Sequence, residues 1–139
     1  MLAYRAFLTE SKDALFMWAV NGGRYTIKSF GGFEQAFEQA REILMPFIRS
    51  LRLYSQTDYF IFVHGGIPAG KTIETASEEE LLWARDIEAY TGKTIVVGHT
   101  PQGNVTRFDH SIAIDTGAFH YGKLSAYDVL HDTIYSATN

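Results

Sequence analysis

The chain has 139 residues, 46% of them hydrophobic and 14% aromatic, which is enough for one domain with a packed core. Its net charge of −4 provides no basic surface for a nucleic-acid duplex or an anionic membrane, and no apolar run reaches the ~20 residues that span a bilayer. It contains no cysteine, which excludes disulfides and thiolate metal sites and fits a reducing compartment. We therefore expect a cytoplasmic location and neither a nucleic-acid nor a membrane partner.

The first third of the sequence is predicted to be helical. Residues 1–20 are expected to form a helix that stops at Asn21-Gly22-Gly23, because glycine readily ends a helix. The clearest helix is 33–51, where apolar residues recur at i, i+3 and i+4. Pro46 is expected to kink or interrupt it. Residues 26–30 are too few to assign.

Two later stretches share one design, an apolar run that ends in glycine and histidine. In the first stretch, residues 59–63 precede His64, and the two glycines after His64 let backbone or a ligand come close. In the second stretch, residues 94–97 precede Gly98-His99. Both runs predict buried strands, and the first is expected to be buried on both faces. Both histidines would then lie at the carboxyl ends of strands, where open α/β sheets bind their ligands. A lone histidine there is usually structural, but two in matching positions suggest one metal site, because neutral imidazole binds Zn, Fe or Mn.

The rest of the chain is predicted to alternate loops, one short helix and two hairpins. Residues 65–76 form a loop, and Ser77 with Glu80 is a capping box that begins a helix expected to include Arg85. The predicted strands pair in sequence order: 104–108 with 111–115, and 123–130 with 133–135.

Asp115-Thr116-Gly117-Ala118 follows an apolar run and has two interpretations. It matches the catalytic signature of aspartic proteases, which pair two such carboxylates to share a proton. The chain after it is short for the flap and core strands of that fold. A strand-ending aspartate that holds a turn is the favoured interpretation.

Six motifs occur together in one order along nearly the whole chain. They are Trp18-Ala-Val-Asn-Gly-Gly23, Val63-His-Gly-Gly66, Leu81-Leu-Trp-Ala-Arg85, Val97-Gly-His-Thr-Pro101, Ile114-Asp-Thr-Gly-Ala118 and Gly122-Lys-Leu-Ser-Ala126. Each motif alone is weak, but the ordered series resembles the phosphoprotein phosphatase branch of the calcineurin-like metallophosphoesterases. Within that branch it is most similar to bacterial serine/threonine phosphatases and diadenosine tetraphosphatase-like enzymes.

The resemblance implies an α/β fold that is part of a four-layer α/β/β/α sandwich. The whole chain, 1–139, would be a single truncated domain whose amino-terminal βαβ half is missing. His64 and His99 would be ligands of the second of two metals. Arg85 would contact substrate phosphate, and Asn21 and Gly22 would help to line the substrate side.

The reaction implied is metal-dependent hydrolysis of phosphate esters or anhydrides, with His64, His99 and Arg85 in the catalytic centre. In the family a hydroxide that bridges two divalent metals attacks phosphorus in line, and the cations and arginine stabilise the developing charge. The metal would be Mn, Fe, Zn or Ni. The substrate would be a phosphoprotein, a dinucleotide polyphosphate or a small phosphoester, and the sequence does not select among them.

The sequence also departs from this family. It contains no Asp-x-His, Gly-Asp-x-x-Asp-Arg-Gly or Gly-Asn-His-Glu/Asp motif. In the family these three motifs supply the first metal site and part of the second. Two histidines alone hold a divalent metal poorly, so we expect at most a partial site and little activity from this chain alone. We also expect an exposed sheet edge and a homo-oligomer formed through it. The alternative is a non-catalytic module that binds phosphate or a partner.

Overall fold

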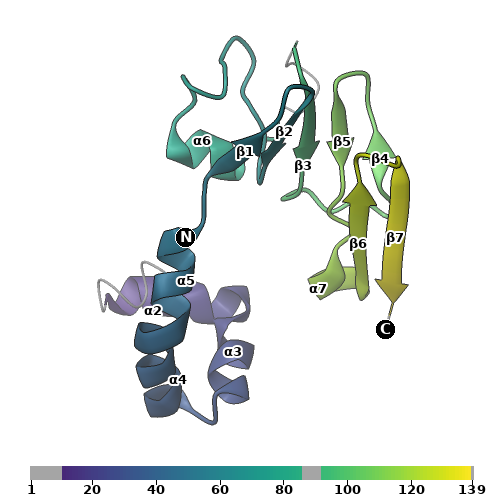
Figure 1. Cartoon of the computed structure of the whole chain (residues 1–139). Coiled ribbons are helices and arrows are strands. Elements are labelled where there is room, and N and C mark those ends of the chain that lie inside the picture. Colours follow the sequence, from purple (N-terminus) through teal and green to yellow (C-terminus); the bar gives the residue numbers. More distant parts are fainter. Residues whose placement is uncertain (1–10, 86–91, 139) are drawn as a thin grey trace. The chain divides into compact units, whose positions relative to one another are not determined.

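The computed structural model describes residues 11–85 and 92–138, and the chain divides into two compact units, Met1–Leu51 and Arg52–Asn139. The first unit is helical and the second is built on a mixed β-sheet (Figure 1). The predicted α/β class is therefore confirmed at this coarse level. No helix within the described ranges has the length and apolar character to cross a bilayer.

The helical unit begins with α2 (Lys12–Trp18), a π-helical turn (Ala19–Gly23) and α3 (Arg24–Ser29). Gly22 has φ of 100°, so regular helix breaks where the sequence predicted a stop. The helix resumes at once, in the stretch that could not be assigned. Residues 1–10 of the predicted first helix lie outside the described residues.

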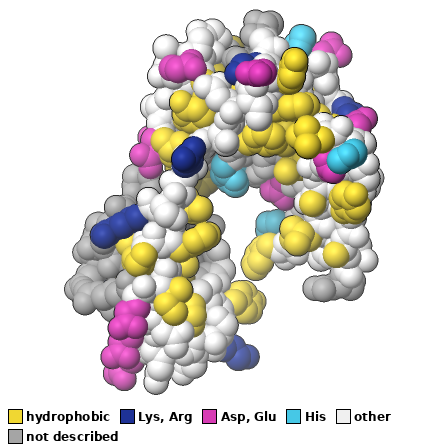
Figure 2. Space-filling view, in the orientation of Figure 1, with side chains coloured by type: hydrophobic (Ala, Val, Ile, Leu, Met, Phe, Trp, Pro, Cys, Tyr) yellow, Lys and Arg dark blue, Asp and Glu magenta, His cyan; other side chains and the backbone are white. Residues whose placement is uncertain are grey.

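The second predicted helix is present but is interrupted. It consists of α4 (Phe33–Gln39), a π-helical turn (Ala40–Leu44) and α5 (Met45–Ser50). The interruption expected at Pro46 is confirmed: the irregular turn precedes Pro46, which cannot bond to the carbonyl four residues back. Several large apolar side chains of this unit stay exposed (Figure 2): Phe16, Met17, Val20, Tyr25, Phe33, Ile43, Phe47 and Leu51.

The second unit contains a five-stranded sheet in the order β1-β2-β3-β5-β4. The strands are β1 (Tyr54–Gln56), β2 (Phe60–Val63), β3 (Thr94–Val97), β5 (Ser111–Ala113) and β4 (Thr106–Arg107). The three central strands are parallel, whereas β1 and β4 are antiparallel edges. The two predicted histidine strands are therefore β2 and β3, and they are direct neighbours.

The main buried cluster lies on one face of this sheet. Ile61 and Val63 pair with Ile95 and Val97, so all four side chains share that face. They form a buried cluster with Ala113, with Ile67 and Ile73 of the 65–76 loop, and with Leu81. Phe60 and Phe62, on the opposite face of β2, are only partly buried. The prediction that β2 is buried on both faces is therefore wrong for this second face, which the described residues cover only in part.

The helix α6 (Glu78–Trp83) begins with the predicted capping box. The Ser77 hydroxyl accepts the Glu80 N–H at 3.3 Å, and the Glu80 carboxylate accepts the Ser77 N–H at 2.8 Å. Lys71 also bonds this carboxylate and is the main reason why the pKa of Glu80 falls to about 2. Ala84 is already extended, so Arg85 follows the helix, and the prediction that Arg85 lies within it is wrong.

Both predicted hairpins are confirmed. The strands β4 and β5 form the first, and β6 (Lys123–Asp128) pairs with β7 (Thr133–Thr138) in a separate two-stranded sheet. A short helix, α7 (Ala118–Tyr121), which the sequence analysis did not predict, packs beside β6 (Figure 1).

Candidate functional site

His64 and His99 lie side by side at the carboxyl ends of β2 and β3. The parallel pairing continues one residue beyond the strands, where the Gly98 N–H donates to the His64 carbonyl oxygen at 3.0 Å. The two ring centroids are 5.1 Å apart and the ring planes are inclined at 61°. Two imidazoles that bind one tetrahedral cation at ~2.1 Å per nitrogen would have ring centres about 5 Å apart, so the observed spacing suits a shared metal.

The backbone at His99 adopts a conformation that is rare for a residue with a side chain. Its φ is 62°, and the Thr100 N–H donates to the Gly98 carbonyl oxygen at 2.7 Å across it, which makes a γ-turn with positive φ. Such a conformation costs about 1–3 kcal/mol and tends to occur at functional sites. Glycine would adopt this turn without strain, so an imidazole at this position points to a role for the ring.

The His99 ring has one nitrogen without a partner. Its Nε2 is buried and has no hydrogen bond among the described residues. The ring also packs edge-on against Trp83 of α6, with centroids 5.2 Å apart. Buried polar atoms without partners are rare in proteins and call for an explanation such as an ion. A metal-ligand role would satisfy this nitrogen.

Arg85 is held beside this pair of rings. Its Nη1 donates to the Thr100 hydroxyl at 2.9 Å, and Thr100 directly follows His99. The guanidinium side chain remains exposed. The structure therefore brings together the three side chains singled out from the sequence, His64, His99 and Arg85. Trp83, which orients His99, was not assigned this role from the sequence.

Asp115 lies two residues beyond β5, the strand next to β3, and reaches the same region. Its carboxylate accepts the Gly117 N–H at 2.8 Å, which confirms the interpretation of this residue as one that holds a turn. A Cβ built at Gly98 would lie 3.6 Å from His64 Nδ1 and 4.0 Å from the Asp115 Cβ. Both distances are ordinary van der Waals contacts, so they place Gly98 beside His64 and Asp115.

The surroundings of the two imidazoles lower the pKa of both rings. Partial loss of hydration lowers the pKa of His64, although the residue stays exposed overall, and the Asp115 charge opposes this shift. Loss of hydration also lowers the pKa of His99, and the Arg85 charge lowers it further, while Asp115 again opposes. A neutral imidazole is the form that binds metal.

These lowered pKa values predict that acid destabilises the sheet unit. Unfolding restores the ordinary histidine pKa of 6.5, so the unfolded chain binds more protons. The free energy of unfolding should therefore fall as the pH drops through about 6.5 and level off below the folded pKa values. Urea unfolding of wild type and of the His64→Asn/His99→Asn variant, followed across this range, measures the effect. An equally steep loss in the variant would contradict this origin.

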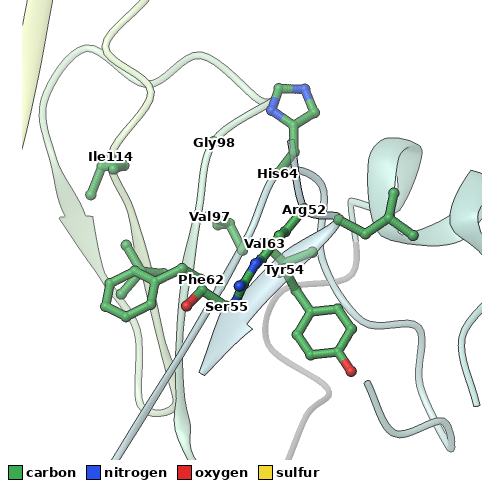
Figure 3. A pocket seen from close by; sticks show the side chains of 11 residues that line it. Arg52, Tyr54, Ser55, Phe62, Val63, His64, Val97, Gly98 and Ile114 are labelled. Carbon is green, nitrogen blue, oxygen red and sulfur yellow. The ribbon is translucent and has the colours of Figure 1, made fainter. Parts of the chain in front are cut away.

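A shallow hollow of about 450 Å³ opens at this end of the sheet (Figure 3). Its walls come from β1, β2, β3 and the residue after β5, and His64 lies at one end of it. The lining includes partly buried Phe62 and Ile114 from the face opposite the core, together with the cationic side chain of Arg52. His64 therefore borders a space that is mostly apolar.

Asn21 and Gly22 lie in the helical unit, at the π-helical turn, where the Asn21 amide donates to the Met17 carbonyl oxygen at 2.8 Å. Their role at the substrate side stays a prediction. Within residues 11–85 and 92–138 no group of three or more histidine or acidic side chains is placed to hold a metal ion.

Comparison of the chain with protein-family models gave no match, and none of the curated proteins matches it either.

Proposed function

We propose that this chain forms the histidine-bearing part of a metallophosphoesterase of the phosphoprotein phosphatase branch. One observation carries the proposal: two imidazoles from adjacent parallel strands lie 5.1 Å apart, and an exposed guanidinium is anchored one residue from the second imidazole. The ordered series of six sequence motifs supports the same assignment.

His64 and His99 would hold a divalent metal. The unpartnered Nε2 of His99 and the spacing of the rings fit this role, and both pKa values are lowered toward the metal-binding form. When bound in a two-metal centre, the cations lower the pKa of a water molecule and neutralise charge on phosphoryl oxygens. Trp83 fixes the orientation of the His99 ring through its edge-on contact.

Arg85 would bind the substrate phosphate. A guanidinium carries five N–H donors in a planar fork, and only one hydrogen bond, to Thr100, is formed among the described residues. The remaining donors can grip two phosphoryl oxygens in parallel, which fixes the orientation of the phosphate as well as its position. The phosphate would be that of a phosphoprotein, a dinucleotide polyphosphate or a small phosphoester.

The four-layer sandwich is the finer part of this proposal. One face of the five-stranded sheet is covered by the 65–76 loop and α6, which would form one outer layer of the sandwich. The other face carries the partly buried Phe60 and Phe62 and borders the apolar hollow. A second sheet, carrying the three motifs that this sequence lacks, would cover that face in the complete architecture.

Complementation by a fragment that carries the absent motifs tests the function. The purified chain is assayed with Mn²⁺ and p-nitrophenyl phosphate, alone and mixed with an amino-terminal phosphatase fragment that carries the three absent motifs. We expect little hydrolysis alone and a gain of at least about 100-fold in the mixture, because two-metal and arginine contacts each contribute several kcal/mol.

The His64→Ala/His99→Ala chain is the control, and it should give no gain when mixed. Vigorous Mn²⁺-dependent hydrolysis by the wild-type chain alone would contradict the partial site. If no gain occurs although the two halves bind each other, the non-catalytic interpretation is the correct one.

A further inference from the structure

We propose that the free edge of β7 is a homodimer interface, at which β7 pairs antiparallel with β7 of a second copy around Tyr135. The sequence predicted an exposed sheet edge and self-association, and β7 presents such an edge among the described residues. This inference is independent of the proposed phosphoesterase activity.

Within residues 11–85 and 92–138, the hairpin β6–β7 has one edge with neighbours and one edge without. On the β6 side, the Thr116 hydroxyl donates to the Lys123 carbonyl oxygen at 2.8 Å, and α7 packs beside the strand (Figure 1). Among the described residues β7 pairs only with β6, and five of its six residues are exposed. A two-stranded sheet is marginally stable in water, and an unpaired edge is a template for another strand.

The composition of β7 favours its own copy as the partner. Residues 133–138 read Thr-Ile-Tyr-Ser-Ala-Thr, with no charge, no proline and no glycine. Natural edge strands usually resist pairing through charges or prolines, and β7 has neither. Because the strand is uncharged, antiparallel pairing of two copies places no like charges opposite each other.

The exposed side chains fit this symmetry. Leu124, Ala126, Tyr135 and Ala137 lie on one face of the hairpin, where Leu124 and Tyr135 are 65% and 61% exposed. A two-fold axis normal to the sheet keeps this face on the same side in both copies, and it requires one residue to oppose itself. With Tyr135 at that position, two tyrosines pair across the axis and an apolar stripe runs through all four strands.

A charged substitution at the centre of the proposed strand pairing tests the dimer. In Tyr135→Lys two like charges face each other across the axis, so we expect the dimer dissociation constant to rise at least about tenfold. Sedimentation equilibrium between about 1 and 100 μM measures it. The matched control is Leu130→Lys, which makes the same change at an 86% exposed position in the hairpin turn and should leave the dimer unchanged.

A single cysteine tests the register, because the chain has no native cysteine. Oxidised Tyr135→Cys should form a disulfide dimer, since directly opposed Cα atoms lie about 4.5–5.5 Å apart. Ser136→Cys should not, because in this register Ser136 opposes Ile134 of the other copy. Monomeric wild type across the concentration range, equal dimerisation of Tyr135→Lys, or preferential cross-linking at position 136 would each overturn the proposal.

Discussion

Replacement of His99 by asparagine is expected to weaken zinc binding by this chain strongly without unfolding it. The residue has φ of 62°, and asparagine is among the few residues that accept such a backbone readily. The substitution removes one of only two imidazoles at the site, so the affinity for Zn²⁺ should fall on the order of 100-fold. Zinc is the better probe than manganese because imidazole sites bind it more tightly. Isothermal titration calorimetry near neutral pH measures the loss.

His110→Asn is the matched control, because His110 is an exposed histidine in the turn between β4 and β5. It should leave zinc affinity unchanged. The thermal midpoint of His99→Asn should equal or exceed that of wild type, since a buried unpartnered nitrogen is removed. Undiminished zinc binding by His99→Asn would refute the shared metal site, whatever the activity of the chain.

Replacement of Gly65 by alanine is expected to destabilise the sheet unit by about 3 kcal/mol. A Cβ at this position would lie 2.8 Å from the Leu82 carbonyl carbon and 2.9 Å from both the Leu81 oxygen and the Trp83 nitrogen. All three atoms are backbone, so no side-chain rotation relieves the clash. The Gly65 N–H also donates to the Leu81 oxygen at 2.8 Å, and this bond would lengthen.

For a unit of this size the thermal midpoint should fall by about 15 °C, which circular dichroism measures. Gly103→Ala is the matched control, because nothing lies within 4 Å of a Cβ built there and its φ is not positive. It should leave the midpoint nearly unchanged. An unaltered midpoint in Gly65→Ala would contradict the close packing of α6 against the end of β2.

Local sequence rules predicted much of the sheet unit. The apolar runs before His64 and His99 specify two strands, and the Ser77–Glu80 capping box specifies the first residue of α6, because both signals act over a few residues. The convergence of the two imidazoles followed from one further rule, that adjacent parallel strands end at the same edge of a sheet.

Other features depend on tertiary contacts that no local pattern encodes. The strand β1, with the sequence Tyr-Ser-Gln, has no apolar alternation and exists because β2 offers it an edge. The helix α6 was predicted to continue through Arg85, yet it ends where the chain turns so that Arg85 bonds Thr100. The γ-turn at His99 could not be predicted from the sequence either, because a Gly-His-Thr sequence does not by itself require positive φ.

The spacing of the two imidazoles is set by backbone pairing rather than by loops. The Gly98 N–H bonds the His64 carbonyl oxygen, so the inter-strand ladder itself fixes how far apart the rings stand. The length of the segment that joins β2 to β3 therefore does not set the backbone separation of the two histidines, although its Trp83 still orients the His99 ring. Such a frame suits diversification by loop exchange: loops that keep Trp83 and the core contacts inherit this separation.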